Sequence, residues 1–130
     1  MAPSKVVDAS VVAAAAFEEE RADEARTLLL AADSLAAPSL LYYELTNIAR
    51  TKSRQNPNDR IRIAQRLLRA FSLNITLLEV DHPAVLELAL EKNLTAYDAS
   101  YVALARQLEA PLLTFDGGLA AAADAFPRWG

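Results

Sequence analysis

Lys5-Val6-Val7-Asp8 is the stretch from which the fold can be worked out, because a short run of strand character ends there on an acid. An Ala- and Val-rich segment, residues 10–17, follows at once and predicts a helix packed closely on that strand. A short apolar strand followed directly by a helix is the opening of a strand–helix–strand unit, in which successive strands run parallel.

The same alternation continues along the chain. Further strands are predicted at residues 34–37, 75–80 and 111–115. The predicted helices cover residues 18–32, 39–54, 59–71, 83–92, 95–109 and 119–125. Ser39 and Thr95 are the expected N-caps of two of them. The pattern predicts a three-layer α/β/α fold with a short, mainly parallel central sheet, and a single domain over residues 1–130, because no linker is long enough to divide the chain.

The composition excludes several kinds of chemistry. None of the 130 residues is a cysteine, which excludes disulfide frameworks, zinc–thiolate sites and cysteine nucleophiles. No apolar run approaches the roughly 20 residues that cross a bilayer, and no signal peptide is recognisable, so we expect a soluble, cytoplasmic protein with no membrane partner. The single histidine, His82, stands at a predicted helix start and is interpreted as solvated or structural rather than catalytic.

Two acids follow predicted strands. Asp8 ends the first strand, and Asp116 comes directly after the last one. In an open α/β sheet, ligands bind at the carboxyl ends of the strands, so both carboxylates are expected at the same edge. Asp81 also follows a predicted strand, and its position alone does not exclude it from the same site.

Two further acids lie on predicted helices beside apolar residues. Glu44 is at the margin of an apolar stripe that includes Leu41 and Leu45, where a carboxylate is costly unless another group pairs with it. Asn47, three residues further on, is a possible polar companion. Asp98 has a similar apolar setting on its own helix.

Each of these acids also has an ordinary structural interpretation. Asp8 can cap the helix that follows it, and Asp98 fits a capping-box pattern. Asp116 can belong to a turn with Gly117-Gly118. Glu44 is the hardest to explain in this way. The alternative is that the acids meet, because a hard divalent cation with oxygen ligands removes the repulsion between neighbouring carboxylates.

Four segments carry these acids in a fixed order. They are Val6-Val7-Asp8-Ala9-Ser10-Val11, Tyr43-Glu44-Leu45-Thr46-Asn47, Leu94-Thr95-Ala96-Tyr97-Asp98-Ala99-Ser100-Tyr101-Val102-Ala103-Leu104-Ala105 and Leu112-Leu113-Thr114-Phe115-Asp116-Gly117-Gly118-Leu119. No segment is specific by itself. Together, over nearly the full chain, they resemble the PIN-domain nucleases and, within them, the VapC-type toxins of toxin–antitoxin pairs.

The resemblance implies a PIN-like fold and a ribonuclease that uses Mg²⁺ or Mn²⁺ to hydrolyse RNA. The implied catalytic and metal-binding acids are Asp8, Glu44, Asp98 and Asp116, and Asp81 falls outside the family pattern. Small polar residues of the family occur at positions equivalent to Ser10, Asn47 and Thr114, which are second-tier candidates. The resemblance also implies a homodimer and a cognate antitoxin. Family members often end in a further short strand, for which residues 125–130 give little signal.

A basic stretch is the second functional candidate. The formal net charge is −4, which by itself argues against nucleic acid, yet seven of the thirteen Lys and Arg residues fall within residues 50–69. One interpretation is a track for RNA phosphates, and the other is a pair of solvated helices. The candidate RNA-backbone residues are Arg50, Lys52, Arg54, Arg60 and Arg62.

The sequence also leaves alternatives to a ribonuclease: a binding module, a phosphoaspartyl protein and a DNA nuclease. A PIN fold kept as a catalytically silent binding module would be favoured by loss of one of the four acids, and none is lost. A phosphoaspartyl hydrolase or receiver domain also carries an Asp after the first strand. Its phosphatase form needs a second Asp where Ser10 stands, and neither Lys5 nor Lys92 fits the receiver pattern. Cleavage of DNA rather than RNA is not distinguished by the residues themselves.

Overall fold

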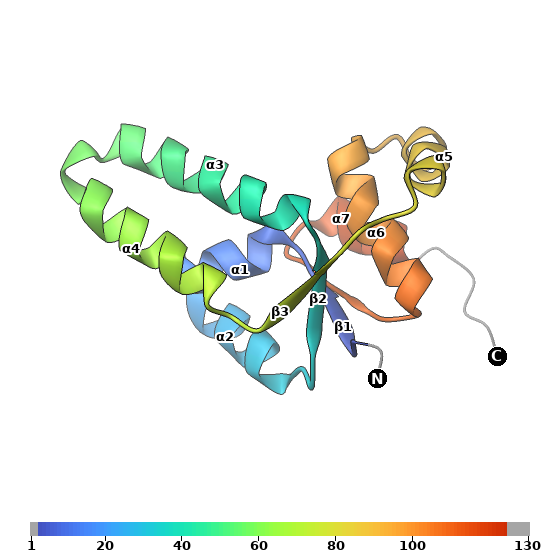
Figure 1. The fold of residues 1–130 in the computed structure, drawn as a ribbon, viewed down its shortest axis with the longest axis horizontal. Coiled ribbons are helices and arrows are strands. Elements are labelled where there is room, and N and C mark those ends of the chain that lie inside the picture. The colour runs from blue at the N-terminus through green and yellow to red at the C-terminus, as the bar shows by residue number, and fades with distance from the viewer. Residues whose placement is uncertain (1–2, 125–130) are drawn as a thin grey trace.

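Four parallel strands form the centre of the molecule in the computed structural model, which describes residues 3–124 (Figure 1). They are β1 (Lys5–Val7), β2 (Leu35–Pro38), β3 (Ile75–Leu78) and β4 (Leu112–Leu113). Their order in the sheet is β3-β2-β1-β4, and every neighbouring pair is parallel. The predicted α/β class with a short parallel sheet is therefore confirmed.

The strands are apolar because helices cover the sheet. Val6 and Val7 of β1 have no exposed surface, and all four residues of β2 are buried. A parallel strand covered on both faces has no polar side to show, so its sequence is a continuous apolar run. This is why the stretch at residues 5–7 predicts its strand so well.

Seven α-helices and one 3₁₀ helix lie within residues 3–124. They are α1 (Ala9–Ala16), α2 (Ala22–Ala31), α3 (Leu40–Gln55), the 3₁₀ helix η1 (Pro57–Asp59), α4 (Arg60–Phe71), α5 (His82–Lys92), α6 (Ala96–Leu108) and α7 (Gly117–Asp124). None of them is long and apolar enough to serve as a membrane span.

The strand order divides the helices between the two faces of the sheet. The chain passes from β1 to β2 to β3 in one direction and then returns past β1 to form β4. Crossovers between parallel strands are right-handed, so reversal of direction moves the connecting helices to the opposite face. Helix α1 packs with α2, α3 and α4, whereas α6 packs across β1, β2 and β4. Figure 1 shows α3 and α4 as a hairpin that projects from one side of the sheet, with α5 and α6 on the other.

Three local predictions were wrong. Residues 18–21 form a turn rather than the start of α2, because Glu18 adopts a left-handed conformation (φ 54°) that reverses the chain after buried Phe17. Ser39 stands at the predicted N-cap position of α3, but its side chain makes no capping hydrogen bond. Residues 117–118, expected in a turn, already belong to α7. Thr95 does cap α6, through a 3.1 Å hydrogen bond from the backbone N–H of Asp98.

Two expectations at the end of the chain fall partly or wholly outside the described residues. These are the last residue of the predicted helix 119–125 and the absence of a final strand over residues 125–130. The residues of the helix that are described, up to Asp124, are helical as predicted.

Candidate active site

The carboxyl edge of β1 and β4 is the natural ligand site of this sheet. These strands are neighbours, yet they are the first and the last in the chain, so the strand order reverses between them. In doubly wound sheets, ligands bind in the crevice at such a switch point. Asp8 follows β1 directly, and Asp116 lies three residues beyond the end of β4.

Asp8 is buried at this edge, and both of its carboxylate oxygens accept hydrogen bonds. Its Oδ1 accepts hydrogen bonds from the backbone N–H of Ser10 (3.0 Å) and of Val11 (3.3 Å), so it caps α1. The same oxygen accepts from Ser10 Oγ at 2.6 Å, and Oδ2 accepts from Thr114 Oγ1 at 2.5 Å. Burial raises the pKa of the Asp8 carboxyl, and these hydrogen bonds offset part of that shift.

Ser10 and Thr114 tie the ends of the two strands together. Ser10 Oγ accepts a hydrogen bond from the backbone N–H of Phe115 (2.9 Å), while Thr114 Oγ1 accepts one from the backbone N–H of Asp116 (3.0 Å). Each hydroxyl therefore donates to Asp8 and accepts from the segment after β4. Two of the three second-tier residues lie directly against Asp8.

Glu44 faces the same edge from α3, the helix that begins just after β2. Its carboxylate is half-buried, and Oε1 accepts a hydrogen bond from the hydroxyl of Tyr101 on α6. Burial raises the pKa of Glu44, and the negative charges of Asp98 and Asp8 raise it further, while the Tyr101 hydrogen bond lowers it. The polar companion of Glu44 is thus Tyr101. Asn47, the companion expected from the sequence, is exposed one turn further along α3 and lines the groove that also contains Ser10.

Asp98 and Asp116 complete the group. Asp98 lies in the first turn of α6, and its pKa is raised by burial and by the charge of Asp116. Asp116 is exposed, and its Oδ1 accepts a 3.0 Å hydrogen bond from the backbone N–H of Leu119, which caps α7. The four acids therefore form an electrostatically connected series across β1, α3, α6 and the segment after β4.

Two of the acids cap a helix and also lie at the candidate active site. Asp8 and Asp116 each cap a helix through Oδ1, and each still lies at the shared edge. Asp81 caps α5 in the same way, through the backbone N–H of Ala84 at 3.4 Å. It follows β3, however, which is the outer strand and is separated from β1 by β2. The tertiary structure thus places Asp81 away from the other acids.

The donor chemistry at this edge fits a hard divalent cation. All four side chains offer carboxylate oxygens, which Mg²⁺ and Mn²⁺ prefer, and mutual repulsion contributes to the raised pKa of Glu44 and Asp98. Within residues 3–124, no group of three or more acidic or histidine side chains is positioned so that it could already hold a metal ion. An open arrangement suits Mg²⁺, which keeps several of its waters and takes only a few protein ligands.

One groove on the surface of residues 3–124 adjoins the acids through Ser10. It has a volume of about 590 Å³ and is lined in part by Ser10, Asn47 and Phe115. A larger groove, about 700 Å³, lies between the end of β3, α5 and α6 and is lined in part by Glu79, Asp81 and Arg106. None of the four acids lines either groove, but Ser10 of the smaller groove donates a hydrogen bond to Asp8, and Phe115 directly precedes Asp116. The smaller groove is therefore the one that adjoins this edge.

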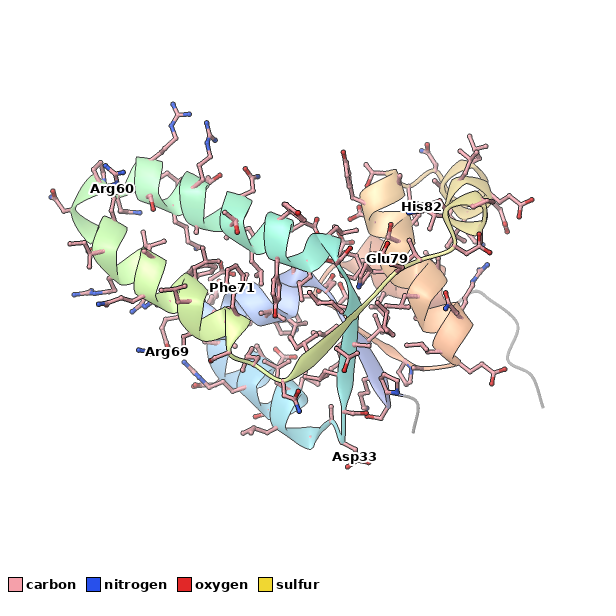
Figure 2. The ribbon with its side chains drawn as sticks, viewed as in Figure 1. Asp33, Arg60, Arg69, Phe71, Glu79 and His82 are labelled. Atoms are coloured by element: carbon pink, nitrogen blue, oxygen red, sulfur yellow. The ribbon has the colours of Figure 1, made fainter. Side chains whose placement is uncertain are left out.

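The basic stretch follows the α3–α4 hairpin away from the acids. Arg50, Arg54, Arg60 and Arg62 are exposed, whereas Lys52 forms a 2.9 Å ion pair with Glu19. Figure 2 shows Arg60 at the far tip of the hairpin, and His82 on the opposite side of the molecule at the start of α5. From Glu44 to the end of α3 the helix rises by roughly 16 Å, so an RNA on the tip would have to be long enough to reach the acids.

Two functional candidates were missed or misread from the sequence. Tyr101 is a buried core residue, and its hydroxyl reaches Glu44. Its spacing of three residues from Asp98 was the available signal, because such pairs share a helix face. Arg21, whose guanidinium lies 3.7 Å from the centroid of the Phe115 ring, was not singled out at all.

The raised pKa of Glu44 gives a prediction for the protein without divalent cations. A proton on Glu44 is held more tightly in the folded than in the unfolded state, so its stabilising effect is complete below the ordinary pKa of 4.5 and is lost as the pH rises through the folded value. Relative to the wild type, Glu44→Gln should therefore gain free energy of unfolding between pH 4.5 and neutral pH, as measured by urea denaturation in EDTA.

Glu18→Gln is the matched control, because it has the opposite sign. The hydrogen bond from Arg26 lowers the pKa of Glu18, so the stabilisation by ionised Glu18 is present above its ordinary pKa and is lost on acidification. This variant should lose stability relative to the wild type over the same rise in pH. If Glu44→Gln and Glu18→Gln change in the same direction, the electrostatic account of Glu44 is wrong.

The comparisons with known proteins agree with this geometry. A family model described as the PIN domain matches residues 5–125. The chain is 34% identical over 119 residues to ribonuclease VapC3 of Pyrobaculum aerophilum, an alignment that covers 88% of this chain and 91% of that protein. It is also similar to the crystal structure of PAE2754 from P. aerophilum, with a TM-score of 0.74 and 31% identity over 94% of this chain and 87% of the other.

A more distant structure shares the fold. It is Mycobacterium tuberculosis VapC20, described as a toxin that cleaves the sarcin–ricin loop, with a TM-score of 0.67 over 92% of this chain and 95% of that one. At 18% identity, this likeness supports the fold alone.

Proposed function

Because this chain belongs to the PIN-domain family and is of the VapC type, we propose that it is a metal-dependent ribonuclease, the toxin of a type II toxin–antitoxin pair. The observation that supports this most is the connected series of four acids at the switch point of the sheet. These are the acids that the family pattern requires, and their charges act on one another between the end of β1, α3, α6 and the segment after β4. Asp8, Glu44, Asp98 and Asp116 are the proposed catalytic and metal-binding residues.

The chain's own residues would prepare the site in three ways. Ser10 and Thr114 fix both oxygens of Asp8 at the floor of the site. Tyr101 orients Glu44 through one oxygen and leaves the other for a ligand or a water molecule. Asp98 and Asp116 lie on the more open side, where substrate would enter.

Bound Mg²⁺ or Mn²⁺ would lower the pKa of a water molecule and stabilise negative charge on the phosphate. Asp8, Asp98 and Asp116 are the expected ligands, directly or through water. Glu44 would bind a second ion or orient the attacking water. No histidine or lysine base is required for this chemistry, which fits the position of His82 on a distant, exposed helix end.

The VapC type also leads us to propose a cognate antitoxin, a homodimer and a cytoplasmic location. Arg50, Lys52, Arg54, Arg60 and Arg62 remain proposed contacts to the RNA backbone. For the exposed ones, the contribution would be sequence-independent and salt-sensitive.

The test is cleavage of total RNA by the purified protein. We expect cleavage in Mg²⁺ or Mn²⁺, none after chelation with EDTA, and recovery when the metal is restored in excess. Single-stranded DNA of matched sequence should be cut much more slowly. Cleavage that persists in EDTA would refute metal dependence, and a folded protein that binds RNA without cutting it under any metal condition would instead indicate a silent binding module.

A further inference from the structure

The groove beside the four acids begins within one hydrogen bond of Asp8. Ser10 lines it and donates to Asp8 at 2.6 Å, and Phe115, which precedes Asp116, lines it and donates its backbone N–H to Ser10. A nucleotide chain whose phosphate lies at the acids therefore has this groove as an adjoining surface.

The groove contains a flat, fixed cationic platform. The guanidinium of Arg21 lies 3.7 Å from the centroid of the Phe115 ring. Two hydrogen bonds to Glu24, at 2.9 Å and 2.8 Å, hold the guanidinium in its orientation. About half of the Arg21 side chain, 49%, remains accessible. A guanidinium stacked on an aromatic ring on one side can accept a nucleobase on its other side.

The facing wall is made by neutral polar residues of α3. Asn47, Thr51 and Gln55 line the groove at a spacing of four residues, so they share one face of the helix over roughly 12 Å. Amide and hydroxyl groups both donate and accept hydrogen bonds, which suits the mixed edges of unpaired bases.

The charges in the groove favour bases over phosphates. Lys52 is paired with Glu19 at 2.9 Å, and Glu20 also lines the groove. The positive charge of the groove is therefore largely balanced by these acids. A duplex presents a continuous row of phosphates to such a surface, whereas an unpaired strand can turn its bases toward it.

We propose that this groove binds the unpaired nucleotide next to the cleaved phosphodiester, with its base stacked on Arg21 and its edge read by the α3 face. The proposal rests on the ribonuclease function and adds a specificity site to it. Arg21 and Phe115 form the platform, and Asn47, Thr51 and Gln55 determine which base is preferred.

The test is the affinity for a short, labelled single-stranded RNA of mixed sequence, measured by fluorescence anisotropy in EDTA so that nothing is cut. Arg21→Ala should weaken binding about tenfold, the usual effect of losing one stacking platform. Arg21→Lys keeps the charge but not the plane and should weaken binding nearly as much. Both losses should persist at high salt, because no phosphate contact is removed.

Arg26→Ala is the matched control. Arg26 lies on α2, is similarly exposed and forms ion pairs with Glu18 and Asp23, but it is not part of the groove. Its removal changes the net charge equally and should leave the affinity unchanged. Thermal unfolding of each variant verifies that the fold is kept.

The proposal is overturned if Arg21→Lys binds like the wild type, or if Arg21→Ala and Arg26→Ala weaken binding equally, since either result would mean that charge alone matters. Cleavage by the wild type in Mn²⁺ distinguishes failure of the groove proposal from failure of the proposed ribonuclease function. If the wild type cuts RNA and Arg21→Ala binds normally, the function stands and the groove proposal falls. If the wild type neither binds nor cuts RNA, both fall.

Discussion

Asp8→Asn is expected to lower RNA cleavage by at least about a hundredfold with little change in stability. The substitution removes a negative charge from the most buried of the four acids, and with it a proposed metal ligand. An Asn oxygen can still accept from the backbone N–H groups of Ser10 and Val11, so the cap of α1 survives. Burial of the ionised carboxylate opposes folding at neutral pH, as its raised pKa indicates, and a neutral amide removes that cost.

The matched control for this prediction is Asp81→Asn. Asp81 also follows a strand and also caps a helix, α5, but it lies beyond β2 and outside the acid group. The Asp81→Asn variant should cut RNA at the wild-type rate. Cleavage is measured as the initial rate in saturating Mn²⁺, and stability is measured by thermal unfolding in EDTA. Equal rates for Asp8→Asn and the wild type would refute the assigned site.

Substitutions of Tyr101 should separate its packing from its hydrogen bond. Tyr101 is 1% exposed and is among the largest fully buried side chains of residues 3–124. Tyr101→Ala should therefore lower the free energy of unfolding by about 3–5 kcal/mol. Tyr101→Phe keeps the packing and loses only the hydrogen bond to half-buried Glu44, a cost of about 1 kcal/mol. Cleavage by Tyr101→Phe should still fall roughly 10- to 100-fold, as is usual when a residue that orients a metal ligand is lost.

Binding of Mn²⁺ gives a readout that a purely structural role would not change. Calorimetric titration without RNA should show weaker Mn²⁺ binding for Tyr101→Phe than for the wild type, because Glu44 is no longer oriented. Tyr42→Phe is the matched control: the Tyr42 hydroxyl donates to the Phe71 carbonyl at 3.4 Å, and its ring stacks on Phe71. If Tyr101→Phe binds Mn²⁺ and cuts RNA like Tyr42→Phe, Tyr101 has no positioning role.

Much of the fold was predictable because its signals are local. The strand at residues 5–7 is a buried apolar run, and α6 is bounded by the Thr95 cap, so each follows from residues a few positions apart. The turn at residues 17–21 was not predictable in this way. The charged residues 18–21 are compatible with the exposed face of a helix, so the sequence predicts that the helix begins at Glu18. In the structure Phe17 is buried and Glu18 is left-handed, so α2 begins only at Ala22.

The α/β class and the parallel strands follow from the order of apolar runs and helical segments in the sequence, and the family resemblance adds the four candidate acids. The position of Asp81 relative to Asp8 depends on strand order, which is a non-local property: the two acids are equivalent by local pattern, and β2 separates their strands. The tertiary structure also decided the partner of Glu44, since Tyr101 lies 57 residues away in sequence, and the contact between Thr114 and Asp8, which spans 106 residues. Periodicity and capping act within a few residues, whereas these contacts exist only once the sheet has ordered its strands.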